Sequence, residues 1–73
     1  MTNHQQELLR RLFDLRDPHA LRLDLPPHNV IPNPDLMQLS RRELEPEKLQ
    51  FARRMRAQDQ RRIVEELNRE MEK

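Results

Sequence analysis

The sequence predicts an all-α fold in one small domain of 73 residues. Glycine, which tight hairpins use because it reaches positive φ without steric cost, is absent. Strand-forming residues are scarce, with two Val, two Ile, one Thr and neither Tyr nor Trp. Leu, Arg, Glu, Gln and Met, which favour helices, dominate the composition. A helical domain follows from these three observations.

The first expected element is a short amphipathic helix over about residues 4–15. Its apolar residues recur at the spacing of one buried helix face, namely Leu8, Leu9, Leu12, Phe13 and Leu15. Thr2 or Asn3 can cap its start through a side-chain oxygen. We expect Asp17-Pro18 to end it, because the residue before a proline avoids the α region.

A proline-rich strap is expected over about residues 23–34. Four of its residues between 26 and 34 are prolines, which favours an extended backbone over a regular helix. Val30 and Ile31 within it need apolar cover, so we interpret the strap as an ordered connection that crosses the helices.

Two further helices are expected, a short one over about residues 34–44 and a long one over about 46–71. Asn33-Pro34 is a start signal for the first, because proline suits the first helical position. No proline interrupts the second, although its middle is almost wholly polar. Its far half is expected to project from the core and to present a separate apolar seam. The seam consists of Ala57, Val64, Leu67 and Met71.

The small size of the chain predicts a partner. A core of this size rarely supplies more than roughly 3–5 kcal/mol, and without Cys neither a disulfide nor a thiolate metal site can add to it. The expected supplement is a second copy of the chain, in a coiled-coil homodimer formed through the seam. The charges favour an antiparallel pair, because residues 49–62 carry a net +4 and residues 63–73 a net −2.

An arginine-rich segment is the strongest candidate site. It contains Arg53, Arg54, Arg56, Arg61 and Arg62. Guanidinium groups pair well with oxyanions, so the segment suits either nucleic-acid phosphates or an acidic protein surface. The alternative is a solvated helix whose charges are neutralised by i, i+4 pairs such as Arg61–Glu65 and Arg62–Glu66.

Catalysis, metals and cofactors are not expected. His4, His19 and His28 match no zinc spacing and are expected at the surface or as caps. Ser40, the only serine, is expected to be a helix N-cap rather than a nucleophile. No Gly-rich phosphate loop is possible in a chain without glycine.

The sequence thus predicts a non-enzymatic protein–protein interaction module, a small dimeric adaptor or inhibitor of a larger protein. A phage- or plasmid-type regulator of a host protein is the expected type, by analogy of size. The partner would meet the arginines or the leucine face formed by Leu8, Leu12 and Phe13. A small nucleic-acid-binding regulator and a structural subunit of an assembly are the alternatives. No signal peptide or membrane segment is expected, which favours a cytoplasmic protein.

Overall fold

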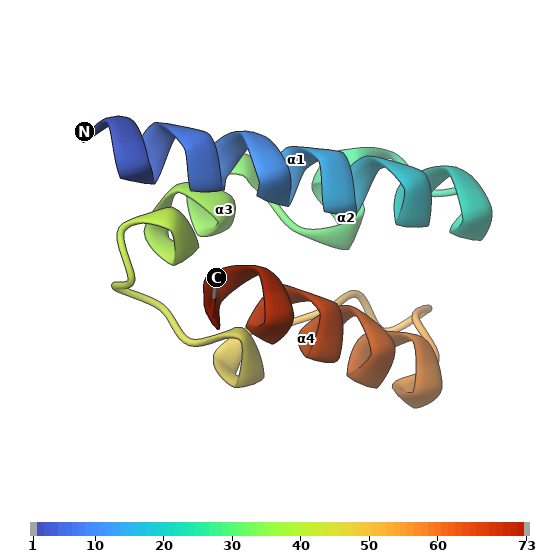
Figure 1. Cartoon of the computed structure of the whole chain (residues 1–73). Helices are drawn as coiled ribbons and strands as arrows, with labels where there is room; N and C mark the ends of the chain where they lie inside the picture. The colour runs from blue at the N-terminus through green and yellow to red at the C-terminus, as the bar shows by residue number, and fades with distance from the viewer. Residues whose placement is uncertain (1, 73) are drawn as a thin grey trace.

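The computed structural model describes residues 2–72 and is all-α, as predicted. Within these residues it has four α-helices, a single 3₁₀ turn and no strand (Figure 1). The helices are α1 (Asn3–Leu23), α2 (Pro27–Val30), α3 (Asn33–Ser40) and α4 (Ala57–Glu72), and the 3₁₀ turn η1 is Pro46–Lys48. Helix α1 packs against each of the other three helices, and α4 runs antiparallel to it.

The start of α1 is the predicted one. The Thr2 hydroxyl accepts a hydrogen bond from the Gln5 amide at 3.2 Å, and the Gln5 side chain accepts one from the Thr2 amide. This reciprocal pair satisfies two amides that the first turn leaves without helical partners. The prediction that Thr2 or Asn3 caps the helix is therefore confirmed at Thr2.

The predicted end of α1 was wrong, because the helix continues through Pro18 to Leu23. A proline inside a helix removes one hydrogen bond and costs about 3 kcal/mol. Packing on both sides of it offsets this cost. Arg16 before the proline and His19 and Ala20 after it are all buried. Local sequence signals at Asp17-Pro18 are thus overridden by tertiary contacts.

Helix α1 ends at Asp24, which has φ 56° and ψ 44°. The Asp24 amide donates to the Leu21 carbonyl and the Leu25 amide to the Ala20 carbonyl. This is the Schellman arrangement, whose left-handed position usually holds glycine. Arg42, with φ 61°, occupies the equivalent position after α3. Because the chain has no glycine, both left-handed positions hold a residue with a side chain, which strains the backbone there.

Replacing Asp24 by glycine is expected to stabilise the protein by about 0.5–1 kcal/mol. The free energy gained by removing the left-handed strain exceeds the entropy cost of the greater flexibility of glycine in the unfolded chain. A higher urea midpoint with an unchanged slope would show it. Asp14→Gly is the matched control, since the same change inside α1 is expected to cost about 0.3 kcal/mol rather than to stabilise the protein. A loss of stability in Asp24→Gly would contradict the strain.

The proline-rich strap is shorter than predicted and partly helical. Prolines 27 and 34 each lie in the first turn of a short helix, α2 and α3 respectively. Val30 and Ile31 are buried between these helices, as the need for apolar cover predicted. Helix α3 ends at Ser40 rather than near residue 44.

The long helix predicted over residues 46–71 is broken. Pro46 begins only the short turn η1, and an irregular segment follows before α4 starts at Ala57. A continuous helix of 26 residues would be about 39 Å long, whereas the longest dimension of the molecule is 34 Å. The break lets Leu49, Phe51 and Met55 fold back onto the same core as α4. The predicted projecting half is therefore wrong, because α4 lies along α1.

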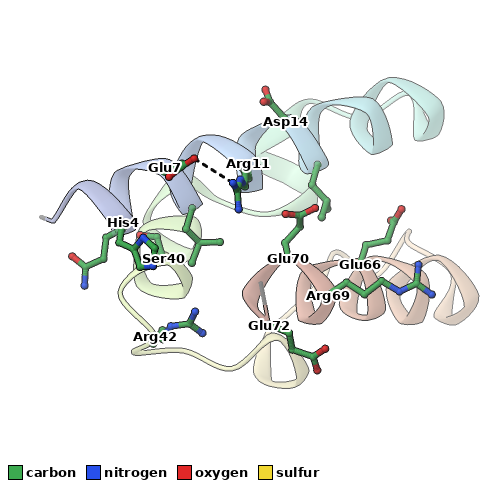
Figure 2. A pocket seen from close by; sticks show the side chains of 13 residues that line it. His4, Glu7, Arg11, Asp14, Ser40, Arg42, Glu66, Arg69, Glu70 and Glu72 are labelled. Carbon is green, nitrogen blue, oxygen red and sulfur yellow. Dashed lines mark hydrogen bonds and ion pairs between the residues drawn. The ribbon is translucent and has the colours of Figure 1, made fainter.

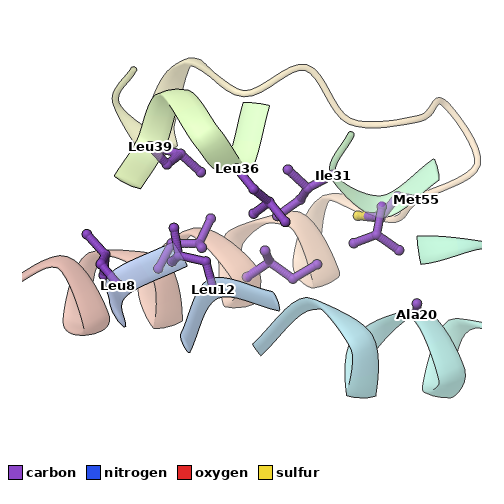
Figure 3. Packing of buried hydrophobic residues seen from close by; sticks show 10 residues of the cluster. Leu8, Leu12, Ala20, Ile31, Leu36, Leu39 and Met55 are labelled. Atoms are coloured by element: carbon purple, nitrogen blue, oxygen red, sulfur yellow. The ribbon is translucent and has the colours of Figure 1, made fainter. Parts of the chain in front are cut away.

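One apolar core joins all of these elements (Figure 3). Its fully buried leucines come from α1, α3 and α4, and Met55 closes it from the irregular segment. The turn η1 is held to α4 by a hydrogen bond of 2.8 Å from the Asn68 amide to Glu47 Oε1. This bond to the charged form holds the pKa of Glu47 below its ordinary value of 4.5.

Candidate functional site

The five predicted arginines gather at one end of the molecule, where the irregular segment enters α4 (Figure 1). We call Arg53, Arg54, Arg56, Arg61 and Arg62 the basic end. All five are exposed. The last turn of α1 lies at the same end, because α1 and α4 are antiparallel.

An ordered backbone presents these arginines. Arg53 and Arg54 form the tip of a turn that is closed by a hydrogen bond of 3.0 Å from the Met55 amide to the Ala52 carbonyl. Met55 is buried and anchors the turn in the core. The Gln60 side chain donates to the Met55 carbonyl at 2.8 Å, which ties the turn to α4. The cations are therefore held on a fixed frame rather than on a loose tail.

None of the five arginines forms an ion pair or a side-chain hydrogen bond within residues 2–72. Neither of the predicted pairs Arg61–Glu65 and Arg62–Glu66 is formed, and Glu66 pairs with His19 instead. The predicted neutralisation by i, i+4 pairs is therefore wrong, although the arginines are exposed, as in a solvated helix face. Its positive charges remain available to an external partner.

The only acid within residues 53–62 is neutralised by another element. Asp59 accepts a hydrogen bond of 3.2 Å from Nη1 of Arg22, which lies in the last turn of α1. With five arginines and one aspartate, residues 53–62 carry a net +4. Because the whole chain carries +1, the rest of it sums to −3. The molecule is thus strongly dipolar, with its positive charge concentrated at the basic end.

The charges of α4 agree with its helix dipole only in part. Negative charge stabilises a helix N-terminus and positive charge a C-terminus, each by about 0.3–1 kcal/mol. Asp59 in the first turn and Arg69 in the last turn follow this rule, whereas the three arginines that directly precede α4 and the two glutamates in its last turn oppose it. The helix dipole alone therefore does not account for the arginines before α4.

A buried histidine fixes Arg22 beside α4. His19 is 8% exposed, against the expectation that it lies at the surface. Its Nδ1 accepts from Nη2 of Arg22 at 3.0 Å, so Nε2 carries the proton and donates to Oε2 of Glu66. The contacts run from Glu66 through His19 and Arg22 to Asp59. These contacts join the last turns of α1 to α4 next to the basic end.

A groove of about 1140 Å³ lies at the other end, between the first half of α1 and the last half of α4 (Figure 2). Its walls carry both signs of charge, with Arg11, Arg42 and Arg69 against a larger number of acids. Glu7 and Arg11 pair within it at 3.2 Å. Because opposite charges alternate, the groove selects no single ionic ligand.

Ser40 lines this groove but is neither a cap at a helix start nor a free hydroxyl. It is the last residue of α3 and is 1% exposed, so the expectation of an N-cap was wrong. Its hydroxyl donates a hydrogen bond of 2.7 Å to the Met37 carbonyl. The same carbonyl also accepts from the Arg41 amide at 3.1 Å, so the hydroxyl adds a second bond to it.

The predicted leucine face of α1 is used inside the molecule. Leu8 and Leu12 are buried in the core, and Leu12 is wholly inaccessible. Phe13 is half-buried, with the Arg16 guanidinium 4.8 Å from its ring centre. These side chains therefore contact other parts of the same chain.

The predicted self-association seam is also partly buried within the fold. Leu67 is fully buried against the core. Val64 and Met71 are half-buried, and only Ala57 is exposed. The structure thus places Leu67 in the core with Met71 packed against it, and leaves Ala57 and Val64 outside that cluster.

Comparisons of the chain with protein-family models, with curated proteins and with solved structures gave no match. Among residues 2–72, no helix is both long enough and apolar enough to cross a membrane. The same part of the chain contains no group of three or more His, Cys, Asp or Glu that could hold a metal ion.

Proposed function

We propose that the protein is a non-enzymatic interaction module that docks onto an acidic macromolecular surface through its basic end. The observation that carries this proposal is the set of five exposed arginines without an ion-pair partner within residues 2–72. Long-range attraction at such an end raises the rate of encounter with an acidic partner and orients it.

Two features support a binding role over a purely structural one. Arg53, Arg54 and Arg56 precede the N-terminus of α4, where positive charge does not stabilise the helix. The turn and the hydrogen bond between Arg22 in α1 and Asp59 in α4 fix the backbone that carries the arginines, which lowers the backbone entropy lost on binding.

The adaptor or inhibitor role expected from the sequence remains part of this proposal, as does a cytoplasmic location. The homodimer also remains a proposal. It now rests mainly on charge complementarity, since Leu67 of the apolar seam is buried in the core. Surface ion pairs are worth little by themselves, so we give self-association less weight than binding at the basic end.

A tagged pull-down from a cell lysate tests the proposal. We expect the wild-type protein to retain bound material that Arg61→Glu/Arg62→Glu loses, because the double change replaces attraction by repulsion. The matched control is Arg10→Glu/Arg41→Glu, which alters the net charge equally at exposed arginines outside the basic end. Circular dichroism checks that both variants keep their helices.

Equal loss from both double variants would mean that only overall charge matters. Unchanged capture by Arg61→Glu/Arg62→Glu would remove the basic end as the docking site. Running each arm with and without nuclease separates a nucleic acid from a protein in the retained material.

A further inference from the structure

We infer that the partner of the basic end is the phosphate backbone of a nucleic acid, which the protein binds without reading the base sequence. This inference rests on the proposed function and names the class of its partner. It follows from what surrounds the arginines, from their chemistry, and from what the segment lacks.

The basic end has no apolar anchor. Protein–protein interfaces place their binding energy in a buried apolar centre surrounded by a polar rim. Among residues 53–62, Met55 is buried in the core and Ala57 is the only exposed apolar side chain. Among residues 2–72, Leu21 is the one large apolar residue that is strongly exposed. It lies in the last turn of α1, at the same end of the molecule, but a single leucine is too small to form a buried apolar centre. A surface of unpaired charge alone suits phosphates better than a protein.

The cations are all arginines, and they lie in two groups on a fixed frame. One pair forms the tip of the turn before α4 and another follows the first turn of the helix. Guanidinium forks pair with phosphate oxygens in bidentate geometry.

Apart from its arginines, the segment offers little that reads bases. Stacking on unpaired bases uses exposed aromatic rings, and the chain has only two phenylalanines, both half-buried. No Asn is present in residues 53–62, and of the two Gln, Gln60 is bonded to the Met55 carbonyl while Gln58 is exposed. We therefore assign the contact to the backbone, where arginine fixes position and carries no sequence information.

Fluorescence anisotropy with a labelled 20-base-pair DNA duplex of mixed sequence tests the inference. If four arginines contact phosphates, the slope of log K against log salt is about −3.6. Affinity then falls about 150-fold between 50 and 200 mM salt. Arg61→Ala/Arg62→Ala is expected to reduce the slope by about two units. The matched variant Arg10→Ala/Arg41→Ala is expected to leave it unchanged.

A second duplex of unrelated sequence is expected to bind equally, and a polyglutamate peptide at least tenfold more weakly. Absence of duplex binding at 50 mM salt, or polyglutamate binding as tight as the duplex, overturns the nucleic-acid assignment. The proposed function still stands in that case if the pull-down depends on Arg61 and Arg62 and survives nuclease. If the pull-down does not depend on these residues either, both proposals fail.

Discussion

Replacing Leu67 by alanine is expected to destabilise the protein by about 2–5 kcal/mol, which approaches the whole stability of a chain of this size. The Leu67 side chain is fully buried where α4 packs on α1, so its removal leaves a cavity that neighbouring helices cannot fill without moving. Urea titration followed by far-ultraviolet circular dichroism measures the loss. We expect a much lower midpoint or a chain already unfolded in buffer.

Leu21→Ala is the matched control, since it is the same chemical change at a side chain that is 85% exposed on α1. It is expected to shift the free energy of unfolding by no more than about 0.5 kcal/mol. The experiment also separates two roles of Leu67. If Leu67→Ala kept its helices and its stability but lost the mass of a dimer, Leu67 would belong to a self-association surface rather than to the core.

Replacing Arg16 by alanine is expected to cost about 3 kcal/mol. Arg16 is 5% exposed, and its Nη1 donates to the Ile31 carbonyl at 3.1 Å and to Asn33 Oδ1 at 2.5 Å. It therefore joins α1 to the ends of α2 and α3. Alanine would leave the buried Ile31 carbonyl without this donor, and it would remove the cation from above the Phe13 ring.

Arg10→Ala is the control for this change, because Arg10 is exposed on the same helix and is expected to shift stability by less than about 0.5 kcal/mol. Arg16→Lys is expected to recover less than half of the loss, since an ammonium lacks the planar fork that bonds and stacks at once. Urea midpoints of the three variants test the order. Equal stability of Arg16→Ala and Arg10→Ala would contradict a structural role for the buried guanidinium.

Short-range signals in the sequence were read correctly where nothing distant competed with them. Thr2 caps α1 by contacts within three residues, and Pro34 lies in the first turn of α3. The signal at Pro18 failed because its outcome depends on packing by α2, α3 and α4, which single-helix patterns do not contain. The break after Lys48 was not predicted for the same reason, because it depends on the packing of Met55 in the core.

The residues of the basic end could be predicted from the sequence, but their ion pairing could not. The arginines of residues 53–62 can be read directly from the sequence, whereas their ion pairs depend on the fold. Glu66 pairs with His19, which is 47 residues away in the sequence, and does not pair with Arg62. Asp59 pairs with Arg22, which is 37 residues away. Helical spacing alone predicted pairs with neighbours four residues away, because it has no information about the opposite helix.

Helix α1 is the element on which the other three helices pack, and it is made first during synthesis. Leu12 in α1 and Leu67 in α4 share one core but are separated by 55 residues of chain. At about 5–20 residues per second, the ribosome takes about 3–11 s to deliver the second after the first. We therefore expect the apolar stripe of α1 to lack its last cover throughout that interval.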